Sequence, residues 1–234
     1  MRVHYIQHVA FEDLGAIQPY LLDKGHDLGV THLYAGEVLP AVDDLDWLIV
    51  MGGPMGIYDY NQYPWLKAEK AFVRQAIDAG KMVLGVCLGA QLIADVLGST
   101  ADKRAVYAGQ HKEIGWFDIH KSVELDETVL GTVFPDTLEA FHWHGDMFDV
   151  PKGAKAVGSS AACSNQGFVY DNRVVGFQFH LETTPESAAA LIDACGDELD
   201  GSIYVQDAQT ILADKKRFER LNQIMYAVLD ALGA

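Results

Sequence analysis

The sequence predicts an α/β fold: a largely parallel central sheet flanked by helices, with a more antiparallel extension. Two observations carry this prediction. Short apolar runs alternate with helix-type patterns in the first part of the chain, and glycines and aromatic residues punctuate short strand patterns over 101–180. Such alternation is typical of parallel sheets, because the connection between two parallel strands usually holds a helix. With 234 residues, 50% of them hydrophobic, the chain can bury one large core, so we expect a single domain over 1–234.

The individual elements follow from hydrophobic periodicity. Strand patterns cover 3–10, 32–39, 45–54 and 82–86, and helical patterns cover 14–25 and 64–79. A further helix is expected directly after Cys87. A last helix is expected over about 205–232, where an apolar stripe recurs at helical spacing: Phe218, Leu221, Met225, Val228 and Leu232. We expect this stripe to dock on the sheet, and the alternative is the seam of a homodimer.

Charge and composition narrow the classes of function. The chain has 33 Asp and Glu against 17 Lys and Arg, a formal net charge of −16, and such a surface repels nucleic-acid backbones and anionic lipids. No apolar stretch approaches the roughly 20 residues that a membrane-spanning helix needs. No secretory signal pattern is visible at the start, and three irregularly spaced cysteines do not suggest a disulfide framework. We therefore expect a cytoplasmic protein that binds neither nucleic acid nor membrane.

One cysteine stands where a strand pattern passes into a helical one, in the stretch KMVLGVCLGAQ over 81–91. The form Gly-x-Cys-x-Gly is typical of a nucleophile elbow, a sharp turn that holds its central residue in a strained conformation. Cys87 would then project from the carboxyl edge of the sheet at a helix N-terminus, where partial positive charge favours the thiolate. Taken alone, the pentapeptide is explained equally well by a small buried cysteine whose glycine neighbours allow tight packing.

A reactive cysteine also needs a base and groups that stabilise the oxyanion. His180 is the best candidate base because Glu182 follows two residues later, on the same face of an extended chain, where it can orient the imidazole. For the oxyanion we expect the amide of Leu88, directly after the nucleophile, and that of Gly53. Gly52 would shape the turn that carries Gly53.

The set Gly52-Gly53-Pro54, then 85–91, then His180-Leu181-Glu182 resembles the class I (triad) glutamine amidotransferase family, in matching order. The resemblance implies a flavodoxin-like fold and no cofactor. It also implies that Cys87 attacks the side-chain amide of glutamine, releasing ammonia through a γ-glutamyl thioester, with His180 and Glu182 completing a triad. Further residues that would contact the substrate by this resemblance are Gln91, Trp143, His144 and Asp146.

Two departures from the family pattern blur the subfamily: Ala90, where many members carry histidine or methionine, and Leu181, where many carry proline. Family members commonly pass ammonia to a synthetase, yet no phosphate-binding loop is found in this chain. The chain therefore either docks a separate synthetase or acts alone. Two alternatives stay open: a stand-alone γ-glutamyl hydrolase with the same triad, and a catalytically silent binding module.

Other cysteines and histidines fit simpler interpretations. Cys163 and Cys195 are expected to be buried bystanders. His142 and His144, with His111 and His120 nearby in sequence, suggest at most a weak zinc site, because no cysteine stands close to them, and we expect no metal. Residues 110–116 are expected to form a structural strand and turn without a catalytic role.

Overall fold

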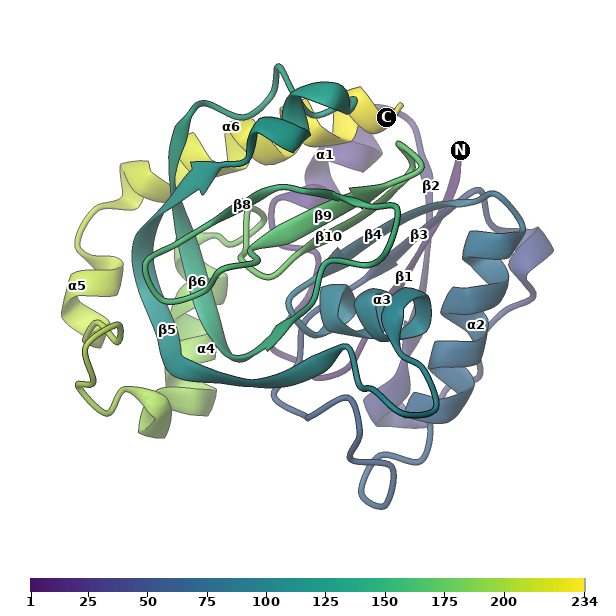
Figure 1. Cartoon of the computed structure of the whole chain (residues 1–234), viewed down its shortest axis with the longest axis horizontal. Coiled ribbons are helices and arrows are strands. Elements are labelled where there is room, and N and C mark those ends of the chain that lie inside the picture. Colours follow the sequence, from purple (N-terminus) through teal and green to yellow (C-terminus); the bar gives the residue numbers. More distant parts are fainter. Residues whose placement is uncertain (234) are drawn as a thin grey trace.

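The computed structural model describes residues 1–233, which form two sheets with helices packed around the larger one (Figure 1). The larger sheet has the order β2-β1-β3-β4-β10-β9-β7. Its strands, in that order, are Asp27–His32, Arg2–Gln7, Trp47–Val50, Met82–Val86, Val174–Phe177, Gly167–Tyr170 and Lys155–Ala156. The first five are parallel to one another, and β9 and β7 continue the sheet in antiparallel pairing.

The smaller sheet is antiparallel and has the order β6-β5-β8. Its strands are Thr137–Phe148, Val106–Lys121 and Gly158–Ser159, in that order. The pairing of β5 with β6 shifts register between Ala108 and Glu113, and the two long strands bend over the carboxyl side of the larger sheet (Figure 1). The smaller sheet therefore lies where it can wall the edge at which the parallel strands end.

Six α-helices accompany the sheets within residues 1–233. Their bounds are α1 (Ile17–Asp23), α2 (Leu66–Asp78), α3 (Leu88–Gly98), α4 (Pro185–Cys195), α5 (Ala208–Leu212) and α6 (Lys215–Leu232). Short 3₁₀ helices cover Leu33–Ala35, Val42–Asp44, Val123–Glu127 and Gly196–Glu198.

Two apolar clusters lie on opposite faces of the larger sheet. Alternate residues of β3 show this, because Trp47 and Ile49 belong to one cluster while Leu48 and Val50 belong to the other. The first cluster packs α1, α4 and α6 together with β5 and β6, and the second packs α2 and α3. The central strands β3, β4 and β10 are buried on both faces, which explains why they are continuous apolar runs in the sequence.

The predicted fold class is confirmed, with local corrections. The second strand is Asp27–His32 and not 32–39, because the chain turns into a 3₁₀ helix at Leu33. The helix predicted over 205–232 is two helices, since Asp214 caps the start of α6 with its side chain. Within 101–180, β7, β9 and β10 belong to the larger sheet and not to a separate extension.

The stripe of α6 is buried inside the chain, as the docking prediction requires. Phe218, Leu221, Met225, Val228 and Leu232 all belong to the first apolar cluster. This face of α6 is therefore not available to form the seam of a homodimer. Among residues 1–233, no helix combines the length and the apolar character that crossing a bilayer demands.

Candidate active site

Cys87 occupies a strained turn between β4 and α3. Its backbone has φ 51° and ψ −106°, a conformation that residues with a side chain rarely adopt. Its N–H donates to the carbonyl of Phe177 at 2.8 Å, which ties the turn to the neighbouring strand β10. Gly89 lies so close to β3 that an added Cβ would overlap the carbonyl of Val50. The glycine is therefore required for the helix to begin directly against the sheet, with Cys87 at the sheet's carboxyl edge.

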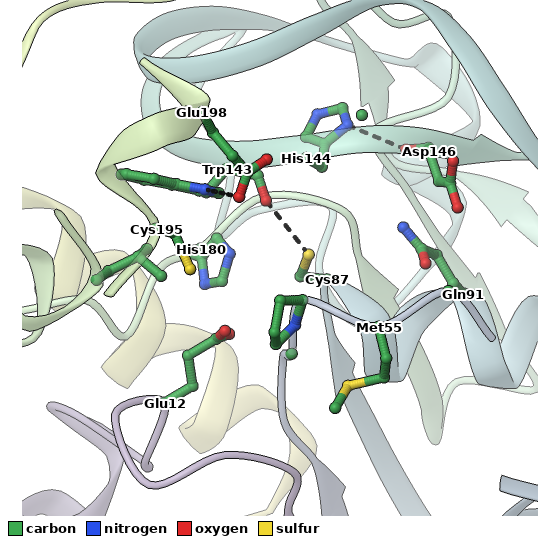
Figure 2. A pocket seen from close by; sticks show the side chains of 15 residues that line it. Glu12, Met55, Cys87, Gln91, Trp143, His144, Asp146, His180, Cys195 and Glu198 are labelled. Atoms are coloured by element: carbon green, nitrogen blue, oxygen red, sulfur yellow. Dashed lines mark hydrogen bonds between the residues drawn. The ribbon is translucent and has the colours of Figure 1, made fainter. Parts of the chain in front are cut away.

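His180 reaches the same edge from the next strand. β4 and β10 are adjacent and parallel, so the residues that follow Val86 and Phe177 emerge side by side. The His180 N–H donates to the Phe141 carbonyl at 2.8 Å, which fixes the backbone against β6. Its Nδ1 lies 2.6 Å from Oε1 of Glu182, and both side chains are buried. In Figure 2 the other side of the ring faces the sulfur of Cys87.

The ionisation of Cys87 and that of His180 each depend on burial and on the other residue. Burial raises the pKa of the Cys87 thiol, although His180 and the N–H of Leu88 both favour the thiolate. The helix N-terminus favours the thiolate, as expected from the sequence, but desolvation outweighs this contribution. Burial also disfavours a charged His180, but Glu182 and Cys87 favour it more, and the pKa of His180 is raised well above its ordinary value. Glu182 therefore makes the ring a strong base beside a buried thiol.

Contacts from distant segments hold Glu182 in place. The Asn222 side chain in α6 donates to the carbonyls of Leu181 and Thr183, at 2.9 and 3.0 Å. The N–H of Ala16 donates to the carbonyl of Glu182 itself at 2.9 Å. Leu181, where the family often has proline, is buried in the first apolar cluster. The backbone on both sides of the carboxylate is consequently fixed by the core.

A cavity of about 200 Å³ opens over the sulfur (Figure 2). Seven of the residues singled out from the sequence line it: Gly53, Cys87, Gln91, Trp143, His144, Asp146 and His180. The carbonyl of Trp143 accepts from Sγ of Cys87 at 3.5 Å. Gly52, Leu88 and Glu182 are not among the lining residues, but Glu182 contacts the ring of His180 and Leu88 directs its N–H at the sulfur. The structure therefore assembles the predicted residues around one cavity.

The family profile described as glutamine amidotransferase class-I matches residues 17–195. The chain belongs to the class I glutamine amidotransferases. The glutamine amidotransferase-like protein YfeJ of Salmonella typhimurium is 34% identical over 239 residues, covering 99% of this chain and 97% of that protein. A crystal structure of a glutamine amidotransferase from Thermotoga maritima has a TM-score of 0.88 and 33% identity, covering 100% of this chain and 99% of its own. A glutamine-hydrolysing GMP synthase component from Halobacterium salinarum is 29% identical over 66% of this chain and 76% of that protein.

Several lining residues of this amidotransferase were not identified from the sequence. Glu12 follows β1, and burial raises the pKa of its carboxyl group to about 7. Glu198 accepts from the indole N–H of Trp143 at 3.1 Å, and Cys195, expected to be a bystander, also lines the cavity. Gln178, which does not line the cavity itself, donates to Sγ of Cys87 at 3.7 Å and accepts from Gln91 at 3.2 Å. These side chains come from loops and strand ends whose places in the fold spacing alone does not reveal.

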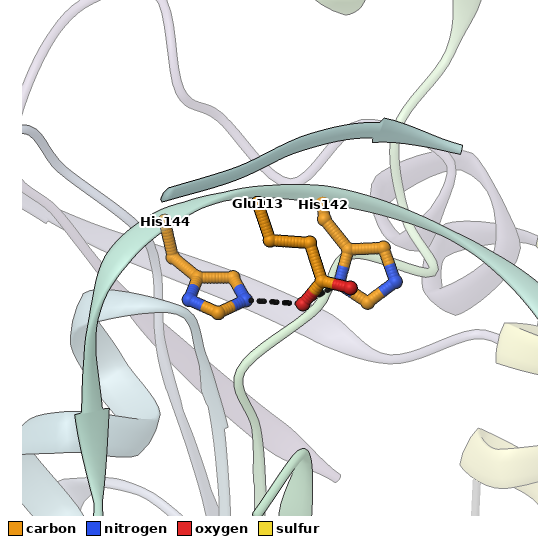
Figure 3. Close-up of side chains that lie close together, drawn as sticks. All are labelled: Glu113, His142 and His144. Carbon is orange, nitrogen blue, oxygen red and sulfur yellow. Dashed lines mark hydrogen bonds and ion pairs between the residues drawn. The ribbon is translucent and has the colours of Figure 1, made fainter. Parts of the chain in front are cut away.

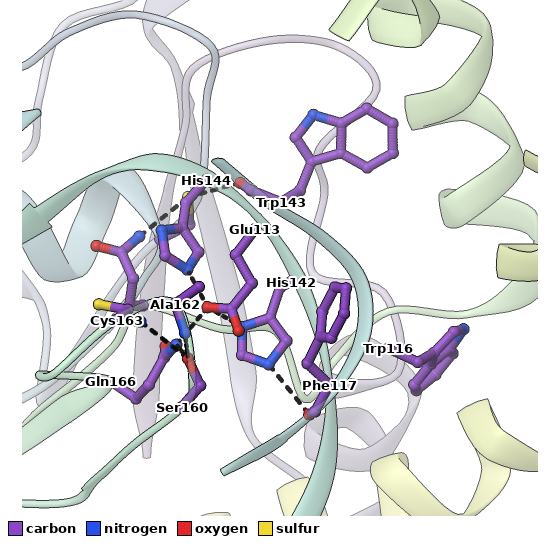
Figure 4. A network of polar contacts seen from close by, with 12 residues as sticks. Glu113, Trp116, Phe117, His142, Trp143, His144, Ser160, Ala162, Cys163 and Gln166 are labelled. Atoms are coloured by element: carbon purple, nitrogen blue, oxygen red, sulfur yellow. Dashed lines mark hydrogen bonds and ion pairs between the residues drawn. The ribbon is translucent and has the colours of Figure 1, made fainter. Parts of the chain in front are cut away.

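Glu113, His142 and His144 form a buried polar cluster under the Trp143 wall of the amidotransferase site (Figures 3 and 4). Glu113 Oε2 lies 3.2 Å from His144 Nε2 and 3.4 Å from His142 Nδ1, and it accepts from Gln166 Nε2 at 2.6 Å. One atom of ligand type from each of the first three residues lies within 4.8 Å of the others. The expectation of no metal therefore stays a prediction. The segment 110–116 is part of β5, as expected, and its Glu113 anchors this cluster.

Proposed function

We propose that this chain hydrolyses the side-chain amide of glutamine, with Cys87 as nucleophile, His180 as acid and base, and Glu182 orienting the ring. The observation that carries the proposal is the geometry of these residues at one cavity. Cys87 sits in a strained turn beside a buried imidazole, whose Nδ1 lies 2.6 Å from a carboxylate. This is the arrangement that activates a thiol for attack on a carbonyl carbon.

The reaction then runs in two halves. His180 takes the thiol proton, and the sulfur attacks the amide carbon to give a tetrahedral oxyanion, which the amides of Gly53 and Leu88 stabilise. The C–N bond breaks as His180 returns its proton to the nitrogen, releasing ammonia and leaving a γ-glutamyl thioester. Water, deprotonated by His180, attacks the thioester, the C–S bond breaks and glutamate leaves. The raised pKa of His180 suits the first proton transfer in particular.

The ammonia is proposed to go to a separate synthetase, which is one of the two possibilities that the sequence leaves open. Support comes from the relative in Halobacterium salinarum, whose name makes it one of the subunits of a glutamine-hydrolysing GMP synthase. The acceptor of this chain is not specified by that likeness. The residues around the Cys87 thiol release ammonia from glutamine in the same way for any acceptor.

A γ-glutamyl hydrolase is a second candidate, and the shape of the cavity favours it. Figure 2 shows lining residues on both sides of Cys87, with Gln91 and Asp146 on one side and Cys195 and Glu198 on the other. If the glutamyl group binds on the side of Gln91, as the family resemblance implies, the opposite side is open to a leaving group larger than ammonia. An amino acid or peptide released from a γ-glutamyl compound would leave from there.

The test measures glutamate and ammonia released from glutamine, and amino acid released from a panel of γ-glutamyl dipeptides. Cys87→Ser should abolish both reactions, whereas Cys163→Ser, a matched change at a buried cysteine that does not line the cavity, should leave them intact. Turnover should also survive treatment with a chelator if no metal takes part. Unchanged turnover in Cys87→Ser would rule out the proposed nucleophile. The ratio of glutamine to dipeptide turnover decides between the two candidates.

A further inference from the structure

We propose that His8 and Glu69 form a buried positioning pair that holds the Gly52–Gly53 peptide with its N–H toward the cavity as an oxyanion donor. The inference rests on the proposed function, because an oxyanion donor matters only where an acyl group is transferred. No sequence motif gives either residue a role. Both lie outside the cavity lining, so they would act on the reaction through the backbone and not by touching substrate.

The pair connects three elements that meet behind the cavity. His8 follows the end of β1, Glu69 lies in the first turn of α2, and Gly52 follows β3. Nδ1 of His8 lies 2.9 Å from the Gly52 carbonyl oxygen, and Nε2 lies 2.7 Å from Oε1 of Glu69. The side chains of His8 and Glu69 are both 0% exposed. A histidine and a carboxylate are costly to bury, so their complete burial indicates a geometry that the fold maintains.

The partners determine where the protons of His8 lie. A carbonyl oxygen can only accept a hydrogen bond, so Nδ1 must carry a hydrogen and donate it to Gly52. Nε2 faces the carboxylate of Glu69. Burial opposes a charge on His8, but Glu69 outweighs it, and the pKa of His8 is raised. The raised pKa favours the form of the ring that carries a hydrogen on both nitrogens, and that form donates to the Gly52 carbonyl and to Glu69.

The hydrogen bond to Gly52 also sets the direction of the next amide. The peptide bonds of residues 1–233 are all trans, and in a trans peptide the N–H points away from the C=O. With the Gly52 carbonyl directed at His8, the Gly53 N–H points to the opposite side. Gly53 lines the cavity, and no group within 1–233 accepts a hydrogen bond from its N–H. This is the free donor that an oxyanion requires.

Without an anchor this peptide would have little reason to keep its orientation. Two consecutive glycines allow a wide range of backbone conformations. A Cβ added at Gly52 would overlap the end of the Glu12 side chain, so that the carboxylate would have to move away from this peptide. If the peptide rotated, a carbonyl dipole would face the developing negative charge in place of an N–H. His8 excludes that orientation by holding the carbonyl.

The experiment replaces the pair and separates oxyanion chemistry from thiol reactivity. His8→Leu combined with Glu69→Leu leaves no unpaired charge in the core. We expect kcat for glutamine or a γ-glutamyl dipeptide to fall about 10²- to 10³-fold, the loss typical of a missing oxyanion donor, with KM changed far less. Alkylation of Cys87 by iodoacetamide should keep its wild-type rate, because that displacement forms no oxyanion.

Two further variants sharpen the result. Glu69→Gln should retain at least roughly a tenth of kcat, because a neutral His8 can still donate from Nδ1 to the Gly52 carbonyl. His4→Leu is the control, since His4 is a partly buried histidine of β1 whose Nε2 lies 2.8 Å from Oγ1 of Thr31, and it does not line the cavity; this variant should retain wild-type kcat. The Glu69→Gln variant also keeps the test valid if the double variant fails to fold.

Three outcomes would overturn the positioning pair: wild-type kcat in the double variant, a parallel fall in alkylation rate and kcat, or a loss in Glu69→Gln as large as that in the double variant. Failure of the proposed function gives a different result, namely no turnover of any γ-glutamyl amide by the wild-type protein. In that case a crystal structure of the double variant decides on the pair. An unchanged Gly52–Gly53 peptide would refute it, and a rotated peptide would support it.

Discussion

The active site strongly perturbs the ionisation of Glu12. Its carboxyl group lies among His180, His8, Glu182 and Glu198, and burial raises its pKa from 4.5 to about 7. The two histidines pull the pKa down while the other two carboxylates push it up. Glu12 is thus protonated in the folded protein over a range of pH in which it is ionised in the unfolded chain.

Replacing this carboxyl group should change stability in a pH-dependent way. Below about pH 4.5 both states hold the proton, so Glu12→Gln should differ little from wild type. As pH rises from there to about 7, only the unfolded state gains by ionising, and wild type loses stability relative to the variant. Above that range the variant should be more stable by on the order of 2 kcal/mol, allowing for partial exposure. Urea unfolding at pH 5 and pH 8 measures the difference.

The matched control for Glu12 is Glu219→Gln, an exposed glutamate of α6 far from the cavity. Its effect on the free energy of unfolding should be the same at both pH values. A Glu12→Gln effect that does not vary with pH would contradict the perturbed carboxyl group and assign the change to packing.

At the residue scale, the sequence reveals the groups that carry a motif and misses those that do not. Cys87, His180 and Glu182 can be chosen because the Gly-x-Cys-x-Gly and His-x-Glu patterns, each ambiguous alone, occur together and in the order of a known family. Glu12, Gln178 and Glu198 stand in no such pattern. Their place beside the sulfur depends on how a loop after β1, the end of β10 and a 3₁₀ turn meet in space, which local sequence does not encode.

At the scale of elements, the turn between β4 and α3 stores backbone strain at Cys87. A positive φ favours glycine, and strain of this type costs about 1–3 kcal/mol. We expect Cys87→Gly to be more stable than Cys87→Ala by about 1 kcal/mol, although glycine usually lowers stability through the entropy of the unfolded chain. Chemical denaturation of the two inactive variants measures this difference.

Cys163 provides the reference for that comparison. It is also buried, but it is not among the residues of 1–233 that have a positive φ. Cys163→Ala should therefore be more stable than Cys163→Gly, the reverse of the order at Cys87. If alanine were the more stable replacement at both positions, the turn at Cys87 would not store the proposed backbone strain.

Element boundaries follow from the sequence best where burial dominates. The strand predicted over 82–86 matches β4, because its residues are apolar on both faces of the sheet. By contrast, α4 is missing from the predicted elements, although Thr184 caps it reciprocally with Ser187 and Pro185 starts it. That capping pattern is a readable signal in the sequence. The strand expected over 32–39 fails because its short apolar pattern suits a strand and a 3₁₀ turn equally.

At the scale of the whole molecule, the first apolar cluster joins the two sheets. It contains Ile49 and Phe177 of the larger sheet together with Trp116 and Phe141 of the smaller one, and Phe218 of α6 packs against the last two. The second cluster includes Phe168 of β9 and Phe148 of β6, which contact each other edge to face. Each of the two apolar clusters therefore contains side chains from both sheets.

This shared packing predicts that residues 1–234 unfold as one cooperative unit, which would bear out the single domain expected from the sequence. Tryptophan fluorescence reports on both sheets, because Trp47 lies in β3 and Trp116 in β5. Its transition in urea should coincide with that of far-UV circular dichroism.

Phe141→Leu and Phe168→Leu, one from each cluster, should each lower this common midpoint by an amount equivalent to roughly 1–2 kcal/mol. Two separated midpoints, or a variant that shifts one probe alone, would show that the smaller sheet is an independent unit. The cavity would then be lined by two domains and not by one, because Cys87 follows β4 while Trp143 lies in β6.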